Sequence, residues 1–263
     1  MMRSLPCVIL LFLLPIQGLG ADPSYEGLDA AAIVKLAEDS IRGDTAQMKA
    51  TMHITTPRWE RTLSFRSWDD GQNDRSFTRI LAPRKDKGTG FLRQSNTLWM
   101  YLPRVERTTR IPPSMMLQSW MGSDFTNDDL ARDSSMVEDY VASAIGAREI
   151  EGTQALGVRL VPHEEAPVVW AKIEAWITAD THAPFLFLYY DEDKPGEFEL
   201  IRRMQFSDVR RVDDRNVPHQ WSMEPIDKPG HMTEITLDEI QFDRKLADSI
   251  FTQSNLKRSE AAR

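Results

Sequence analysis

Alternating apolar and polar positions run through most of the chain and predict β-strands. In the stretch from Trp59 to Trp68, Leu63 and Phe65 share one face while Ser64 and Arg66 share the other. Similar runs recur at short intervals, separated by aspartate, glycine and proline residues that favour turns. About ten or eleven such strands are expected, without strand–helix–strand alternation. The pattern therefore predicts a mainly β protein built as an antiparallel meander.

One stretch departs from simple alternation. Thr97 to Pro103 is apolar at nearly every position, which is typical of a strand buried on both faces. Methionine, leucine and aromatic residues then crowd the segment from Pro112 to Phe125, interrupted by prolines and glycine. That segment is too irregular for a regular strand or helix. A large sheet beside an apolar flap indicates a protein that covers something hydrophobic.

Strands of the second half show further regularities. Arg148 to Gly152 and Gly157 to Pro162 are expected to pair as a hairpin. In a later strand, the alternation predicts that Phe198, Leu200, Met204 and Phe206 share one face. In the last strand the apolar phase slips by one residue after position 237, which predicts a bulge near Asp238-Glu239.

Two segments have helical character. Leu28 to Arg42 is amphipathic and is expected to end at Gly43 as a C-cap. It could be packed permanently on the core, or it could be a movable cover. Asp124 to Arg132 is expected to be a second helix, with Asp124 as its N-cap and further aspartates near its positive end. A calcium site among these aspartates is an alternative, although the EF-hand ligand spacing is missing.

The N-terminus predicts export. Residues 1–21 combine a basic head, an apolar run of about a dozen residues and small residues, which is typical of a secretory signal peptide. Residues 22–263 then form a single domain without cysteine, because Cys7 lies in the signal. After cleavage the net charge is about −9, which disfavours nucleic acid as a partner. A soluble monomer in the periplasm fits these features.

Motifs for chemistry are sparse. None of the histidines has metal-ligand spacing, and no nucleophile elbow, phosphate loop or dinucleotide fingerprint occurs, so no metal, cofactor or catalytic residue is expected. Asp191 and Glu197 allow the alternative of a secreted β-sandwich carbohydrate-active hydrolase. A ligand-free interaction domain with a packed core is a further alternative. The apolar strand faces, rich in methionine and aromatic residues, instead favour a cavity for apolar ligands.

Several motifs resemble one family. Thr97-Leu98-Trp99-Met100-Tyr101-Leu102-Pro103, the arginines that follow it, and Met121-Gly122-Ser123-Asp124-Phe125 with Asp129-Leu130 resemble the outer membrane lipoprotein-sorting proteins, which are LolA-like periplasmic carriers. Trp176, Tyr189-Tyr190-Asp191, Arg203-Met204, Pro218 and Ile250-Phe251-Thr252 are also similar. The resemblance spans most of the mature chain.

The resemblance implies a strongly curved antiparallel sheet, an incomplete β-barrel with a helical lid. It implies a non-enzymatic carrier of lipid or lipoprotein acyl chains between the inner and outer membranes. Its implied partners are an inner-membrane transporter, for which the RND type is a candidate, and an outer-membrane acceptor. The side chains expected to line the hydrophobic cavity are Leu63, Phe65, Phe91, Trp99, Tyr101, Ile173, Leu200 and Met204. The lid is expected to include Leu36, Met116, Trp120 and Phe125. Arg107 and Arg110 are candidates for a headgroup or partner contact, and Arg66 and Arg75 for the arginine that holds the lid.

Overall fold

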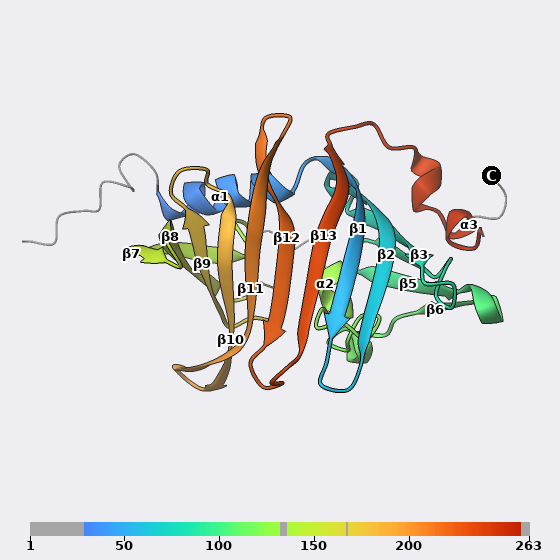
Figure 1. The fold of residues 1–263 in the computed structure, drawn as a ribbon, viewed down its shortest axis with the longest axis horizontal. Coiled ribbons are helices and arrows are strands. Elements are labelled where there is room, and N and C mark those ends of the chain that lie inside the picture. The colour runs from blue at the N-terminus through green and yellow to red at the C-terminus, as the bar shows by residue number, and fades with distance from the viewer. Residues whose placement is uncertain (1–28, 132–135, 167, 259–263) are drawn as a thin grey trace, which may run out of the picture.

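The fold is a single, strongly curved antiparallel sheet (Figure 1). A computed structural model describes residues 29–131, 136–166 and 168–258, so the expected signal peptide at 1–21 lies outside the described residues. The strands within those ranges are β1 (Thr45–Thr55), β2 (Glu60–Asp70), β3 (Arg75–Ala82), β4 (Gly90–Gln94), β5 (Thr97–Leu102), β6 (Arg107–Arg110), β7 (Tyr140–Ile150), β8 (Thr153–Pro162), β9 (Lys172–Thr178), β10 (Pro184–Lys194), β11 (Glu197–Val212), β12 (Arg215–Pro225) and β13 (Met232–Phe242).

The order of these strands confirms the predicted fold class. It runs β6-β5-β4-β3-β2-β1-β13-β12-β11-β10-β9-β8-β7, so sequence neighbours pair throughout and β13 closes onto β1. Strands β6 and β7 are the two ends of the sheet and do not pair with each other in the part of the chain that the structure describes. The sheet is thus an open half-barrel of 13 described strands, a few more than the sequence pattern predicts.

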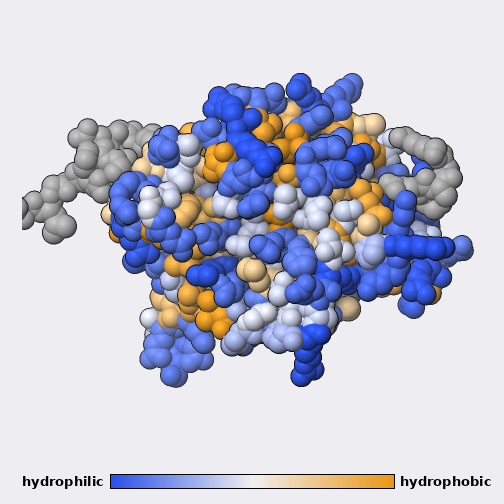
Figure 2. Space-filling model, viewed as in Figure 1, coloured by the Kyte–Doolittle hydropathy of each residue, from blue (hydrophilic) through white to orange (hydrophobic). Residues whose placement is uncertain are grey.

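The outward face of the sheet is the more polar one. Figure 2 shows mostly hydrophilic side chains over the central strands, with apolar residues in scattered patches. The main apolar cluster instead lies on the concave side, beneath the helices. This division follows from the alternation of side chains along each strand.

The helices are α1 (Ala30–Ile41), α2 (Asn127–Ala131) and α3 (Gln253–Leu256). Helix α1 lies behind strands β8–β12 in Figure 1, where it contacts β7, β9 and β12, and its Asp29 side chain accepts from the Ala32 N–H at 2.7 Å. Ile33, Val34 and Ala37 are its fully buried apolar residues. In the described ranges, the helices are all shorter or more polar than a bilayer span requires.

Gly43 has a different role from the predicted C-cap. The C-cap of α1 is Arg42, in an extended conformation. A Cβ atom on Gly43 would lie only 2.5 Å from the Asp243 carboxylate oxygen, at the junction with β13. The glycine is therefore required for a close approach of two segments rather than for a left-handed turn.

Two features of the strand register bear on the predictions. The turn between β7 and β8 lies at Glu151-Gly152, so the predicted hairpin is present but its first strand extends back to Tyr140 and its turn lies earlier than expected. Lys49 pairs with Glu239 and Ala50 with Leu237, leaving the intervening Asp238 unpaired. The predicted bulge at Asp238-Glu239 is therefore confirmed, and it returns the end of β13 to the concave face.

A second bulge escapes the sequence pattern. Tyr189 pairs with Arg202, but Tyr190 pairs with Leu200, so Ile201 has no partner in β10. Because of this extra residue, the side chains of β11 that precede Ile201 point to the face opposite to the one that strict alternation predicts. Leu200 therefore lies on the outer face, although the alternation predicted that it shares a face with Met204.

The C-terminal segment covers the outer face of β3–β5. Phe251, in the 3-10 helix Asp248–Phe251, and Leu256 form a second cluster with Phe77, Leu92 and Tyr101 from the sheet. Polar contacts hold the segment in place. The Arg79 guanidinium donates hydrogen bonds to two backbone carbonyls of α3, that of Asn255 at 2.6 Å and that of Leu256 at 3.0 Å. This end of the sheet is thus buried on both faces, as the apolar stretch at 97–103 predicts.

Replacing Phe251 with alanine tests the outer cluster. Loss of a fully buried aromatic ring is expected to lower the free energy of unfolding by about 3–5 kcal/mol. The matched control is Ile250→Ala, because Ile250 is only partly buried against the same cluster and its loss is expected to cost less. Urea unfolding followed by circular dichroism measures both. Equal effects of the two variants would contradict this assignment of the core.

Candidate ligand-binding cavity

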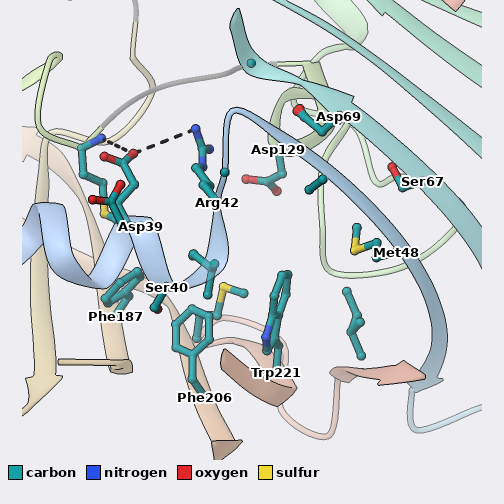
Figure 3. A pocket seen from close by; sticks show the side chains of 18 of the residues that line it. Asp39, Ser40, Arg42, Met48, Ser67, Asp69, Asp129, Phe187, Phe206 and Trp221 are labelled. Carbon is teal, nitrogen blue, oxygen red and sulfur yellow. Dashed lines mark hydrogen bonds and ion pairs between the residues drawn. The ribbon is translucent and has the colours of Figure 1, made fainter. Parts of the chain in front are cut away.

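A large cavity lies between the concave face of the sheet, helix α1 and the segment that ends in α2 (Figure 3). Its volume is about 1140 Å³. That is slightly above the range of roughly 300–1,000 Å³ that small-molecule pockets occupy. The described part of the protein therefore has room for a bulky ligand on the side of the sheet that carries its apolar residues.

One wall of the cavity is apolar and built from four adjacent strands. Met204 and Phe206 of β11, Phe187 of β10 and Trp221 of β12 lie side by side along it, with Ile235 of β13 continuing the wall. The rings of Phe187 and Phe206 are 5.0 Å apart, and those of Phe206 and Trp221 are 5.9 Å apart. Such edge-to-face contacts hold the aromatic rings in place and leave a preformed apolar surface.

The opposite end of the cavity is polar, although the same strand faces continue into it. On β2, the concave positions change from Leu63 and Phe65 to Ser67 and Asp69. Ser67 Oγ lies 2.9 Å from Thr78 Oγ1 on β3. In Figure 3 the labelled aromatic side chains lie on the lower side of the pocket, and Arg42, Asp69 and Asp129 lie above them. The cavity is therefore amphipathic along its length.

The segment from Pro112 to Ala131, here called the lid, covers the concave side of β2 and β4. The Trp120 ring contacts Phe65 and Phe91 edge-on, with centroid distances of 5.7 and 5.5 Å. Trp120 and Phe125 are buried, and a backbone hydrogen bond of 2.7 Å from the Trp120 N–H to the Phe125 carbonyl closes the loop between them. The irregular apolar segment of the sequence is thus a folded cover.

An ion pair between a buried arginine and a carboxylate that is 22% exposed attaches the lid to the sheet. Arg202 of β11 donates two hydrogen bonds to the Asp129 carboxylate of α2, at 2.6 and 2.9 Å. The guanidinium carbon also lies 4.4 Å from the Trp170 ring centroid and 4.7 Å from that of Tyr189. Bidentate geometry and two aromatic faces compensate for removing the charges from water. The described structure therefore holds the lid by an electrostatic contact as well as by apolar packing.

The pKa values around this pair follow from its surroundings. Burial alone would raise the pKa of the Asp129 carboxyl, but the hydrogen bonds and positive charge of Arg202 outweigh burial and hold that pKa below its ordinary value of 3.8. Burial raises the pKa of the Tyr189 phenol to about 12. At neutral pH the pair is therefore charged and the phenol is neutral.

Further contacts fix the middle of the lid. Arg61 of β2 donates to the Met121 carbonyl at 2.9 Å and pairs with Asp86 at 2.5 Å. The Asp124 carboxylate accepts from the Thr233 hydroxyl of β13 at 2.7 Å. The lid is therefore anchored to β2, β11 and β13 at separate points.

The predicted second helix is shorter and is capped differently. Asp124 does not cap it, since its carboxylate is bonded to β13. Instead the Thr126 hydroxyl accepts from the Asp129 N–H at 3.2 Å, and Asp129 accepts from the Thr126 N–H at 2.7 Å, which is a reciprocal capping arrangement. No cluster of potential metal ligands occurs among the described residues.

Three of the predicted cavity residues line the cavity, namely Phe65, Ile173 and Met204. Leu63 and Phe91 belong to the same concave cluster but lie outside the lining, where Phe91 supports the lid. Contact between any of these residues and a ligand remains a prediction.

The prediction was wrong for three other cavity residues, which lie on the outer face of the sheet. Trp99 and Tyr101 join the cluster beneath the C-terminal segment, because alternation in β5 directs Leu98 and Met100 inward instead. Leu200 is turned outward by the bulge in β11. A strand that is apolar on both faces gives no sign of which face encloses the cavity, and a bulge between apolar residues leaves no clear phase slip.

Three of the four predicted lid residues line the cavity, namely Leu36 of α1 and Trp120 and Phe125 of the lid. Met116 is partly buried and packs against the concave cluster. The charged candidates lie elsewhere. Arg107 and Arg110 are exposed on the edge strand β6 and do not line the cavity, so a headgroup or partner contact by them remains only a prediction.

The arginine that holds the lid is neither of the two candidates. Arg66 lies 3.8 Å from Glu239, on the outer face of β2. Arg75 pairs with Asp70 and with Asp248 of the C-terminal segment. The sequence signal that could have identified Arg202 was a charged residue two positions from Leu200 and from Met204, in phase with the apolar positions of the strand. The unpaired Ile201 obscured the face on which it lies.

The open half-barrel of this protein also occurs in proteins of known structure. Solved structures with the same architecture include a domain assigned as an outer membrane lipoprotein-sorting protein from Vibrio parahaemolyticus, at 20% identity and a TM-score of 0.74, covering 87% of this chain and 98% of that one. A DUF1329 family protein from Desulfovibrio piger is 22% identical with a TM-score of 0.75, and the match covers 86% of this chain and 97% of that one. A LolA superfamily protein from Nitrosomonas europaea is 20% identical with a TM-score of 0.71, and the match covers 87% of this chain and 99% of that one.

These similarities confirm, at the level of the fold, the resemblance that the sequence motifs predict. The chain belongs to the family whose model, described as "-like: Uncharacterized protein", matches residues 72–258, more than half of the sequence. None of the curated proteins matches the sequence. The fold is therefore that of LolA-like proteins, and function must be argued from the cavity.

Replacing Arg202 with methionine tests the attachment of the lid. The substitution leaves the partly buried Asp129 carboxylate without its partner, and it is expected to destabilise lid closure by about 2–4 kcal/mol. Hydrogen exchange at the amides of 120–126 should then accelerate while the central strands stay protected. The control is Arg203→Met, because Arg203 is the next residue, is partly exposed and pairs with Glu224 outside the cavity. Similar exchange in both variants would argue against the attachment.

The lowered pKa of Asp129 predicts a pH dependence. A carboxyl whose pKa is lower in the folded state stabilises that state above its unfolded pKa, and the contribution is lost as pH falls through the folded pKa. Protection of the lid amides is therefore expected to be level from about pH 5 to 8 and to decline below about pH 4. Asp129→Asn should remove this acid-dependent step. A step near neutral pH would contradict the assignment.

Proposed function

We propose that this protein binds the acyl chains of lipids or lipoproteins in its cavity and carries them across the aqueous space between the inner and outer membranes. No covalent bond is made or broken in this function. The observation that carries the proposal is a cavity of about 1140 Å³ with a continuous aromatic and methionine wall, closed by an anchored lid. The titles of two fold relatives, a lipoprotein-sorting domain and a LolA superfamily protein, agree with it.

The energetics of such a carrier suit this site. Burial of each methylene is worth about 0.8 kcal/mol, so about ten methylenes gain roughly 8 kcal/mol in a dry cavity. Release then requires that lid opening cost only a few kcal/mol. An ion pair that lies partly at the surface, as Asp129 does, provides a contact of about that size. The lid is therefore suited to hold a chain and to let it leave.

The setting of this function is also a proposal. The signal-like residues 1–21 and the cysteine-free remainder suit a periplasmic carrier. Its partners would be an inner-membrane transporter, for which the RND type is a candidate, and an outer-membrane acceptor. The alternatives have less support, because Asp191 and Glu197 are exposed on the β10–β11 hairpin and a packed interaction domain would lack a cavity of this size.

A charge placed in the apolar wall tests the proposal. Met204→Lys is expected to weaken binding of a fluorescent fatty-acid probe at least about tenfold, since a methionine contact is replaced by an ammonium that must stay hydrated. Leu200→Lys is the matched control, because it lies on the same strand with its side chain on the outer face. Circular dichroism melts check that both variants fold.

A second measurement asks whether the natural ligand is a lipid. The protein is purified gently from periplasm and extracted, and the extract is analysed by mass spectrometry for acyl lipids. Absence of lipid together with absence of probe binding to the wild-type chain would remove the proposed function. Equal loss of binding in the two lysine variants would remove the assignment of the wall.

A further inference from the structure

The turns that follow β1, β3 and β5 lie at the same end of the sheet, because every second turn of an antiparallel meander emerges on the same side. Residues 56–61, 83–88 and 103–107, here called the basic rim, form these turns and the strand ends beside them. The rim carries seven cationic side chains and three carboxylates, a formal charge of +4, whereas the whole chain is at −8. The net charge of the chain therefore hides a surface of the opposite sign.

Contacts between the turns make the rim continuous. Arg61, at the start of β2, pairs with Asp86 of the β3–β4 turn at 2.5 Å. A Cβ atom on Gly88, in the same turn, would lie 3.4 Å from the Pro103 ring of the β5–β6 turn. The three turns are therefore neighbours in space, and their charges act together on an approaching partner.

Most cations of the rim are exposed and have no carboxylate partner. Asp86 is occupied by Arg61, and Glu60 lies 3.9 Å from His53, so Glu106 is the remaining carboxylate of the rim. Within the described part of the chain, no ion pair is formed by Arg58, Arg84, Lys85, Arg104 or Arg107. Their long side chains are therefore available to an anionic partner from outside.

Exposed apolar side chains lie among these charges. Val105 in the β5–β6 turn is 65% exposed, and Trp59 in the β1–β2 turn is 44% exposed. Trp59 also lies against the lid, since a Cβ atom on Gly122 would be 3.6 Å from its ring, and the two segments meet at the lower edge of the sheet in Figure 1. Apolar side chains surrounded by cations are typical of surfaces that bind anionic lipids, and an indole is favoured at the boundary between headgroups and water.

We propose that the protein docks reversibly on an anionic membrane surface through the basic rim. The cations are spread over three turns, which suits the laterally spread charge of anionic lipids, and the apolar side chains gain contact with the headgroup region. An acidic polypeptide would match the cations alone, whereas a lipid surface matches the cations and the apolar side chains together. Docking in this way brings the lid to the membrane, and it does not depend on what the cavity binds.

Vesicle co-sedimentation of the purified protein tests the proposal. One set of vesicles is phosphatidylcholine alone, and the other contains equal parts of phosphatidylcholine and phosphatidylglycerol. Binding to the anionic vesicles is expected to be at least about tenfold tighter at low salt, and it should weaken as salt is added. Equal binding to the two sets, or no binding to either, would overturn the proposal.

Charge reversal locates the docking surface. The double variant Lys85→Glu with Arg104→Glu cancels the formal charge of the rim and is expected to weaken binding to anionic vesicles at least about tenfold. The matched control is Arg244→Glu with Lys245→Glu, because these exposed residues follow the opposite end of β13 and change the net charge equally. Circular dichroism melts check that both variants fold. An equal loss in the two variants would mean that net charge rather than the rim causes binding.

Val105→Ser separates a lipid surface from an acidic polypeptide. It is expected to weaken vesicle binding about threefold or more and to leave binding of soluble polyglutamate unchanged, because only the lipid surface receives the apolar side chain. Polyglutamate that binds as tightly as the anionic vesicles, with no effect of Val105→Ser on either, would assign the rim to an acidic polypeptide and remove the membrane.

The cavity variant distinguishes this proposal from the acyl-binding function. Met204→Lys is expected to lose the fatty-acid probe but to keep its binding to anionic vesicles, because Met204 lies in the cavity and outside the rim. Loss of vesicle binding in this folded variant would show that the cavity rather than the rim meets the lipid. If the wild-type protein docks but binds no probe, the acyl-binding function fails while docking stands.

Discussion

The structure depends on covering an apolar surface. Thirteen described strands place methionine, aromatic and aliphatic side chains on one concave face, and such a face would be costly to leave in water. Helix α1 covers part of it and the lid covers part, leaving a cavity between them. The Arg202–Asp129 pair joins the lid to the sheet at a defined point, whereas apolar packing alone is not directional. The cover is therefore held by two kinds of interaction, one apolar and one electrostatic.

The same concave face serves two purposes along its length. Near the lid, Phe65 and Phe91 pack against Trp120. Further along β2, Ser67 occupies the equivalent position and, with Thr78 on the neighbouring β3, meets the charged end of the cavity. Because side chains alternate strictly, this change of polarity needs no change in backbone. An amphiphile could thus align its apolar and polar parts with one continuous surface.

The two faces of the sheet are divided between binding and stability. Strands β3–β5 carry the C-terminal segment on the outside and the lid on the inside, so their outward residues, including Trp99 and Tyr101, are part of a packed layer. Strands β10–β12 leave their outer face mainly to solvent and their inner face to the cavity. Substitutions on these two sets of strands should therefore have separable effects.

The sequence by itself determined the mainly β fold class and the bulge at Asp238, because both follow from local alternation of apolar and polar residues. It marked the lid segment by the opposite sign, an apolar stretch without alternation. It also identified Phe65, Ile173 and Met204 as inward residues. It could not determine which face of a doubly apolar strand is concave, nor detect a bulge that falls within the apolar pair Leu200-Ile201. Nor could it pair Arg202 with Asp129, which are distant in the chain. Those features depend on register and curvature, which arise only when all the strands pair and the lid is in place.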